Sequence, residues 1–242
     1  MDVPTSLPLV FLILFLATFT RSALGFGGAL IAMPLLTMVV GIRIATPLVA
    51  FMGITIALMI LLKRWREVDV RSAFRLILAS AVGVPVGIQL LQRVPEGLVK
   101  GILGFVLILF GVYQWLSPQL PQVNSLILEF LFGFFAGVLG GAYNINGPLI
   151  VVYGTLRKWK PEHFRATLQG YFLPTGIVIL VSHKLAGLWT GQVFQYYFYS
   201  LPIILLGILI GGWAHKRLTA PIFLKVVYAF LILMGIKLMV GK

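Results

Sequence analysis

The chain has 242 residues, of which 60% are hydrophobic and only 10% are charged, and its mean hydropathy is +1.04. So few polar side chains cannot cover a water-soluble globule of this length, and the composition therefore predicts a polytopic membrane protein. The net charge of +13 comes from 19 Lys and Arg residues, most of them in short links between apolar runs. Basic residues in such links orient helices in a bilayer, and we expect no nucleic-acid partner. The sequence contains no cysteine, which excludes disulfides and cysteine-bound metal clusters.

Apolar runs follow one another along the whole chain. The first five cover about 7–20, 28–40, 46–62, 73–92 and 98–116, and the next five cover about 126–139, 147–156, 165–182, 196–214 and 221–240. The uncharged, proline-containing link 117–124 separates the two series, and we place there a boundary between an N-terminal repeat, 1–118, and a C-terminal repeat, 119–242. The predicted fold is all-α, with a single membrane domain made of two internal repeats. Each repeat is expected to contain a broken or re-entrant first helix and three transmembrane helices.

A glycine-rich break followed by a proline occurs once in each series. Its residues are Gly25, Gly27, Gly28 and Pro34 in the first copy and Gly137, Gly140, Gly141 and Pro148 in the second. Three pairs of residues share an offset of 114 positions, namely Gly27 with Gly141, Pro34 with Pro148, and Pro47 with Pro161. The shared offset indicates a duplication. Breaks at corresponding places in the two halves of a transporter are a pointer to its binding site.

The first two runs are short for membrane helices. A span needs about 20 helical residues, so 7–20 and 28–40 are each expected to be too short to cross alone. They could join as one broken span or fold as a re-entrant hairpin. With hairpins the repeats are inverted, both termini lie outside, and the Lys and Arg residues divide 12 inside to 7 elsewhere. The spanning alternative divides them about 10 to 8, with Arg21 unassigned. The positive-inside rule therefore favours inverted repeats.

A helix that begins inside the membrane presents unpaired N–H groups and a positive dipole end, which favour an anion. Proline is favoured in the first turn of a helix, so Pro148 predicts a helix start with Asn144, Asn146 and Gly147 beside it. We expect both asparagine amides to donate hydrogen bonds to the anion. In the first copy the helix could begin near Gly28, or only at Pro34.

Arg21 stands four residues before Gly25, inside the apolar region. Charged residues at membrane depth are costly and usually face a cavity, so Arg21 is a candidate anion ligand. The residue 114 positions later is Phe135, so we expect an asymmetric site. Gln169 belongs to a polar stripe that could line the cavity or bond between helices. The candidate substrate-binding residues are Arg21, Gly25, Gly27, Gly28, Pro34, Gly140, Gly141, Asn144, Asn146, Gly147, Pro148 and Gln169.

Other functions find little support in the sequence. It contains no G-x-S-x-G or H-E-x-x-H motif and no paired intramembrane aspartates, so we expect no enzyme. His163, His183 and His215 lie at the ends of runs without a second ligand at useful spacing, so we expect no metal and no cofactor. Small-xxx-small spacings such as Gly83 with Gly87 could pack the repeats together or pair two protomers as a homodimer.

The motif residues resemble those of a known family. The stretch from Gly25 to Leu36, its echo from Gly137 to Pro148 and the twofold arrangement are similar to the sulfite exporter TauE/SafE family, also called the toluene sulfonate uptake permease family. Where a third consecutive glycine is common in that family, this chain has Ala29 and Ala142. The resemblance implies an integral carrier, in the plasma membrane of a bacterium, for a sulfur-containing anion such as sulfite, sulfoacetate or an organosulfonate.

Export is the favoured direction, because an inside-negative potential drives an anion outward without a coupling ion. We therefore expect an exporter whose partners are a small anionic substrate and membrane lipid. An anion channel and a non-transporting membrane scaffold of a multi-subunit system are the alternatives.

Overall fold

The computed structural model describes residues 6–116, 122, 125–159, 161–214 and 221–240, and all secondary structure in these ranges is helical. Each of the ten predicted runs forms a helix. In order, the elements are α1 (Leu7–Leu24), α2 (Gly28–Val40), α3 (Ile42–Arg64), the 3-10 helix η1 (Trp65–Glu67), α4 (Val70–Arg93), α5 (Glu96–Leu116), α6 (Leu126–Tyr143), α7 (Gly147–Leu156), α8 (Pro161–Leu185), α9 (Gly191–Ala214) and α10 (Pro221–Val240). The predicted boundary at 118/119 and His215 lie outside the described residues.

The helices differ in length. Within the described residues, seven helices are long and apolar enough to cross a membrane, as expected of a multi-pass membrane protein, namely α1, α3, α4, α5, α6, α8 and α9. The expectation that the first element is too short to cross alone is wrong for α1, which has 18 residues, as has α6. α1 continues beyond its apolar run because Arg21 and Ser22 are buried against other helices rather than exposed to lipid. α2 and α7, with 13 and 10 residues, are too short to span.

The first break lies where the sequence predicts it. Gly25 ends α1 in the left-handed region with φ of 89°, and its N–H donates to the carbonyl of Arg21 at 2.8 Å. Gly27, with φ of 93°, precedes the first residue of α2. Only glycine adopts such angles freely, so the sequence of this break determines its backbone. α2 begins at Gly28 and carries Pro34 inside it. Of the two expected starting points, Gly28 is therefore correct and Pro34 is not.

The second break lies further along the chain than the glycine motif indicates. Gly140 and Gly141 are in the last turns of α6, and the break covers Asn144–Asn146. Asn144 adopts φ of 55°, and asparagine is the residue besides glycine that most often tolerates this conformation. Gly141 instead serves helix packing, because an added Cβ would lie 2.3 Å from the carbonyl oxygen of Val84 in α4. The expectation that the two breaks share the 114-residue offset is therefore wrong.

Glycine seams join helices that are distant in the sequence. A Cβ added to Gly83 or Gly87 of α4 would lie 2.0 Å from carbonyl oxygens of α6. In α9, a Cβ added to Gly211 would lie 2.5 Å from the carbonyl oxygen of Phe19 in α1, and one added to Gly207 would lie 3.0 Å from Cβ of Thr18. The small-xxx-small spacings thus pack helices within the chain.

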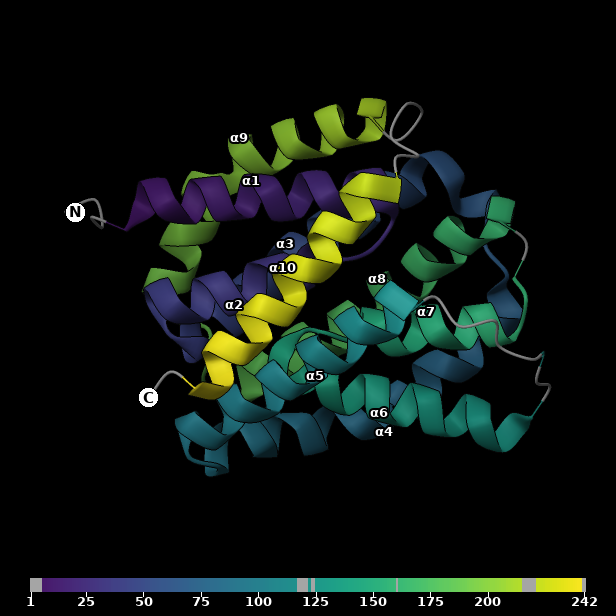
Figure 1. Cartoon of the computed structure of the whole chain (residues 1–242), viewed down its shortest axis with the longest axis horizontal. Coiled ribbons are helices and arrows are strands. Elements are labelled where there is room, and N and C mark those ends of the chain that lie inside the picture. The colour runs from purple at the N-terminus through teal and green to yellow at the C-terminus, as the bar shows by residue number, and fades with distance from the viewer. Residues whose placement is uncertain (1–5, 117–121, 123–124, 160, 215–220, 241–242) are drawn as a thin grey trace.

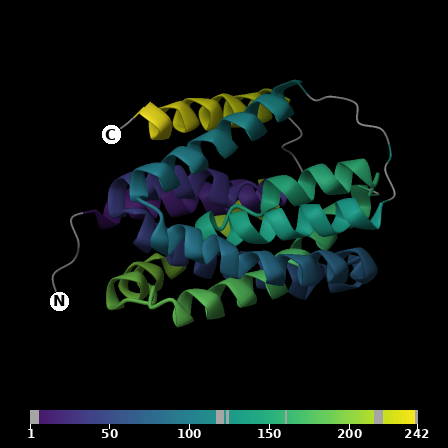
Figure 2. The same cartoon turned by 90° about the horizontal axis from the view of Figure 1, so that it is seen from below.

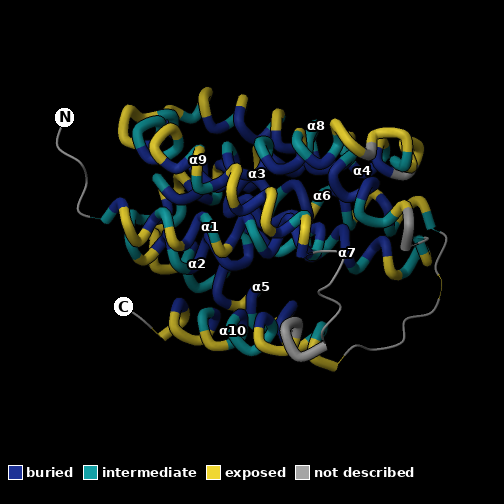
Figure 3. The backbone as a smooth tube through the Cα atoms, turned by 90° about the horizontal axis from the view of Figure 1, so that it is seen from above, coloured by how far each residue is buried: buried dark blue, intermediate teal, exposed yellow. Residues whose placement is uncertain are grey.

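The chain reverses direction at each break. Figure 1 shows α2 turning back along α1, and α7 turning back along α6, and both pairs are in contact. We call α1 with α2 the first hairpin and α6 with α7 the second hairpin. α1 begins at the left end of the bundle in Figure 1 and α6 at the right end. Figures 2 and 3 show α5 and α10 crossing as a pair on one side of the other helices.

The outward surface of the bundle is apolar. On α1 the side chains of Leu9, Leu12 and Leu16 are between 42% and 54% exposed, at the three- and four-residue spacing of one helical face. Figure 3 shows exposed segments on the outer faces of the helices and buried segments between them. This pattern suits a chain that is surrounded by lipid and keeps its polar groups inside.

Candidate functional site

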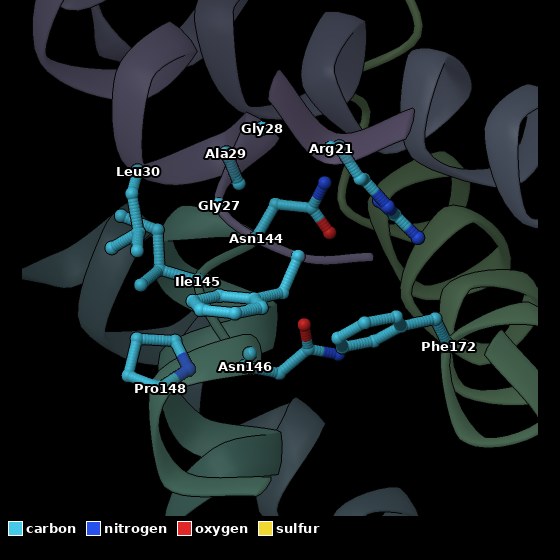
Figure 4. A pocket seen from close by; sticks show the side chains of 12 residues that line it. Arg21, Gly27, Gly28, Ala29, Leu30, Asn144, Ile145, Asn146, Pro148 and Phe172 are labelled. Carbon is cyan, nitrogen blue, oxygen red and sulfur yellow. The ribbon is translucent and has the colours of Figure 1, made fainter. Parts of the chain in front are cut away.

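The two breaks meet at one small hollow inside the bundle. About 280 Å³ there is not filled by protein atoms, counting the part that is open to solvent. The lining residues are Arg21, Phe26, Gly27, Gly28, Ala29, Leu30, Asn144, Ile145, Asn146, Gly147, Pro148 and Phe172. Figure 4 shows the side chains of Asn144 and Asn146 reaching toward the same space from the second break, with Phe172 approaching from α8. Residues that are more than 110 positions apart in the sequence thus form one cavity.

Two helices begin at the hollow. α2 starts at Gly28, after Gly27, and α7 starts at Gly147, after Asn146. α7 begins one residue before Pro148, so the helix start predicted from that proline is confirmed to within one residue. Neither residue that precedes these helices makes a side-chain cap. The N–H groups of each first turn have no partner within the helix, and the positive ends of both helix dipoles lie beside the cavity.

Arg21 is the charged residue of the cavity wall. It lies in the last turn of α1 and is only 7% exposed. Its Nη2 donates to Oε1 of Gln169 at 3.2 Å, and its Cζ lies 4.7 Å from the ring centroid of Phe172, which allows a cation–π contact. Its Nε is buried without a hydrogen-bond partner, and no described carboxylate forms an ion pair with it. The guanidinium is therefore desolvated and has no counter-ion among the described residues.

One face of α8 holds the first break in place. Arg165, Gln169 and Phe172 follow at the four- and three-residue spacing of a helical face. Arg165 donates to the carbonyl of Ser22, and Nε2 of Gln169 donates to the carbonyl of Gly25 at 2.6 Å. Gln169 is fully buried, so its amide fixes Arg21 and the break together. The sequence predicted Gln169 but missed Arg165 and Phe172, which the same helical spacing from Gln169 could have found.

Gly53 of α3 lies directly against Arg21. A Cβ added to Gly53 would lie 3.1 Å from Nη1 of Arg21 and 3.6 Å from Nδ2 of Asn144. The guanidinium and the Asn144 amide thus lie together over a residue without a side chain. The sequence does not single out Gly53, because nothing local distinguishes it from the packing glycines.

The other candidate residues lie around the hollow. Gly25 is in the first break, where its carbonyl accepts from Gln169. Gly140 packs against the second break, since an added Cβ would lie 3.4 Å from Cβ of Asn146. Pro34 is buried within α2, and Gly141 faces α4, so neither lines the hollow. In the described part of the chain, no three His, Asp or Glu side chains are grouped as metal ligands.

Comparison with known proteins agrees with this geometry. The sequence profile of the family described as "Sulfite exporter TauE/SafE" matches residues 10–238, nearly the whole chain. The chain belongs to the sulfite exporter TauE/SafE family. It is therefore a membrane transporter, as the motif resemblance and the apolar helices predict.

A curated relative is also named as an exporter. The "Probable sulfite/organosulfonate exporter TauE" of Cupriavidus necator is 26% identical over 178 residues, which cover 69% of this chain and 68% of the relative. No solved structure matches the chain. Membership of a transporter family, rather than of an enzyme family, accords with a cavity built from helix ends and one arginine.

Proposed function

We propose that this TauE/SafE protein exports a sulfur-containing or organic anion, such as sulfite, sulfoacetate or an organosulfonate, and binds it in the hollow between the two breaks. The observation that carries the proposal is the buried guanidinium of Arg21, which has no carboxylate partner among the described residues. A buried charge left unpaired by loss of its partner costs about 3–5 kcal/mol. A bound anion supplies the missing counter-charge.

The cavity offers several donors besides Arg21. The N–H groups of Gly28 and Gly147 belong to first helical turns, and the Asn144 amide lies next to the guanidinium. Together they replace water around an oxyanion, while both helix dipoles favour its charge. Gln169, Arg165 and Phe172 act on the anion indirectly, by fixing Arg21 and the first break.

The two halves form inverted repeats in this proposal. α1 and α6 begin 119 residues apart (126 minus 7), as do α2 and α7 (147 minus 28) and α3 and α8 (161 minus 42). At this offset Gly25 corresponds to Asn144 and Gly27 to Asn146, so the first break aligns with the second when the two halves are compared. Arg21 corresponds to Gly140 rather than to Phe135, and the charge of the site is asymmetric.

The packing of helices supports the same symmetry. Exchanging the halves turns the α4–α6 contact into the α9–α1 contact, and both are glycine seams. The same exchange leaves the α3–α8 and α5–α10 pairs unchanged, as expected for helices beside a twofold axis. Since the two hairpins enter from opposite ends of the bundle, that axis lies in the plane of the membrane.

We place the basic end of the bundle inside the cell. Arg66, Arg157 and Lys158 line one hollow with His163, where the chain passes from α3 to α4 and from α7 to α8. The positive-inside rule puts this end in the cytoplasm and the start of α1 outside. The bacterial relative supports an inner membrane of a bacterium, where the membrane potential drives anion efflux.

Flux into proteoliposomes of the purified chain tests the proposal. Sulfite, sulfate, thiosulfate, sulfoacetate and an aromatic sulfonate are offered at imposed potentials. We expect saturable, potential-driven flux of at least one sulfur anion, and a loss of about 100-fold in Arg21→Ala, because the anion loses its desolvated charge partner. Arg43→Ala removes an exposed arginine of α3 and is the matched control, expected to transport normally.

Thermal unfolding of each variant in detergent shows whether it is folded. Wild-type flux in a folded Arg21→Ala variant would remove Arg21 from the site. Absence of flux for every anion at every potential would contradict the transport function of the isolated chain.

A further inference from the structure

α4 and α6 form a groove on the outward surface of the bundle. A Cβ added to Gly133 would lie 2.9 Å from the carbonyl oxygen of Leu76, and one added to Gly141 would lie 2.3 Å from that of Val84. These contacts follow the same order along both helices, so α4 and α6 are parallel, and Figure 1 shows them side by side. About 660 Å³ between their outer faces is not filled by protein atoms, counting the part that is open to the surroundings.

The walls of this groove are apolar. Leu78 and Val82 of α4 form one wall, Leu126 and Phe130 of α6 form the other, and all four side chains are between 52% and 68% exposed. The floor is the small side chain of Ala79, which is buried where the helices approach most closely. Large side chains on both sides of a small one leave room for a slender apolar group.

One end of the groove is charged. Nη1 of Arg75 lies 3.5 Å from Oε2 of Glu129, and the arginine side chain is 40% exposed whereas the glutamate side chain is only 3% exposed. The buried carboxylate therefore holds the guanidinium from the inside, and the remaining N–H donors of Arg75 stay accessible from the outside. Arg71 is exposed and lies one helical turn earlier on the same face of α4. Two arginines thus stand at the surface above the apolar walls.

The length of this face matches one leaflet of a bilayer. Val82 follows Arg75 by seven residues (82 minus 75), about 10 Å along the helix at ~1.5 Å per residue. The exposed face continues to Val86, about 16 Å from Arg75. Half of a hydrocarbon core of ~30 Å is about 15 Å. The arginines therefore reach the level of the lipid headgroups when the apolar walls lie within the leaflet.

A phospholipid has the same order of parts as the groove. Its phosphate oxygens match the donor geometry of a guanidinium, and its acyl chain matches the apolar walls. Basic pockets between transmembrane helices bind anionic headgroups in this way. A partner helix would instead need an acidic side chain at the depth of Arg75, and such side chains are rare in membrane segments. Charge and shape therefore favour a lipid over a protein as the occupant.

We propose that the groove between α4 and α6 binds an anionic glycerophospholipid, with its phosphate on Arg71 and Arg75 and one acyl chain between the apolar walls. In the proposed orientation of the molecule, this lipid belongs to the cytoplasmic leaflet. The groove and the anion hollow share no lining residue, so the two sites are separate. A lipid that contacts both helices also stabilises the seam between α4 and the second hairpin.

Photo-crosslinking in proteoliposomes tests the lipid site. Two probes with the same diazirine-bearing acyl chain, a phosphatidylglycerol and a phosphatidylcholine, are each added in trace amounts to phosphatidylcholine vesicles that contain the full chain. Mass spectrometry gives the labelling of the groove relative to Phe105 and Leu109, which are exposed on α5. We expect this relative labelling to be at least about fivefold stronger with phosphatidylglycerol, the factor for one basic side chain near the membrane surface, because Glu129 offsets part of the charge.

Four variants identify the groups that set this preference. Arg71→Gln/Arg75→Gln/Glu129→Gln removes all three charges and leaves no buried carboxylate without its partner, and its preference should fall to about one. Arg71→Gln alone changes an exposed residue and should also lower the preference, whereas Glu129→Gln keeps both arginines and should retain or raise it. Arg93→Gln removes an exposed arginine at the other end of α4 and is the matched control. Thermal unfolding in detergent shows whether each variant is folded.

The outcomes either support or overturn the lipid site without depending on transport. Equal labelling of the groove by the two probes in the wild type overturns the inference. An unchanged preference in the folded triple variant, or in Arg71→Gln, overturns the role of the arginines in binding the headgroup. Cross-links between two copies of the chain at the groove, in place of lipid labelling, would make it a dimer interface and overturn the inference as well.

Discussion

Arg21 shows how far a single residue can be interpreted from the sequence. A lone arginine close to a glycine break predicted a cavity, and the structure buries Arg21 on the wall of a hollow. Its contacts could not be foreseen in the same way, because Gln169 and Phe172 reach it from a helix almost 150 positions later in the sequence. Gly53 was equally hidden, since its role is the absence of a side chain beside the guanidinium.

Gly53→Ala should weaken anion binding without unfolding the protein. The added Cβ would lie 3.1 Å from Nη1 of Arg21, so the guanidinium must shift by a few tenths of an ångström. We expect the apparent KM for the anion to rise about tenfold, the effect of weakening one hydrogen bond to a charged group. Gly97→Ala in α5, where a Cβ meets nothing within 4 Å, is the control. An unchanged KM in Gly53→Ala would show that the position of Arg21 is not set by α3.

The helices as elements were largely predictable. Apolar runs located all ten, because every membrane helix must satisfy its own backbone and cover it with apolar side chains. The helix ends were less predictable where protein rather than lipid surrounds them. Ser22 and Asn144 lie past the apolar runs. Ser22 still belongs to α1 and Asn144 ends α6, because neighbouring helices bury both residues.

The glycine motif alone does not locate the second break. Gly140 and Gly141 indicated a broken helix, but glycines are also used where two helices approach closely. The sequence alone does not separate these uses, whereas the contact of Gly141 with α4 does. The 114-residue offset therefore located the second copy of the motif but misplaced the break within it.

Gly137→Ala should destabilise the seam between α4 and α6. Its Cβ would lie 2.2 Å from the carbonyl oxygen of Ser80 and 2.7 Å from its Cα, so two backbones must separate. Overpacking of this kind costs about 1–3 kcal/mol or more, which lowers the unfolding temperature in detergent. Gly101→Ala in α5 meets nothing within 4 Å and should unfold like the wild type. Equal unfolding temperatures for the two variants would contradict this, because α4 and α6 would then separate without loss of stability.

At the scale of the whole molecule, the seams restrict which bodies can move. α4 packs on the second hairpin and α9 on the first, so each hairpin is tied to a helix of the other half. In the proposed transport cycle, we therefore expect the first hairpin to move with α9 and the second hairpin with α4. The hollow lies between these two bodies and opens to one side at a time as they rock.

Labelling of single cysteines tests the orientation of the molecule. The natural chain has no cysteine, so Gly97→Cys and Trp65→Cys each introduce one reporter, both at exposed positions and separated by the 24-residue helix α4. A membrane-impermeant maleimide should label Gly97→Cys in intact cells and Trp65→Cys only after permeabilisation. The reverse pattern would place the basic end outside and contradict the proposed topology.

In the proposed function, both breaks bind the same anion. The most direct measurement is the equilibrium binding of sulfite to the purified wild type, Arg21→Ala, Asn144→Gly and the double variant. Glycine at position 144 keeps the left-handed backbone and removes only the amide. We expect each single variant to bind at least about tenfold more weakly, and the double variant to lose less than the product of the two factors. Wild-type affinity in folded Arg21→Ala, or strictly multiplicative losses, would contradict a single site shared by the two breaks.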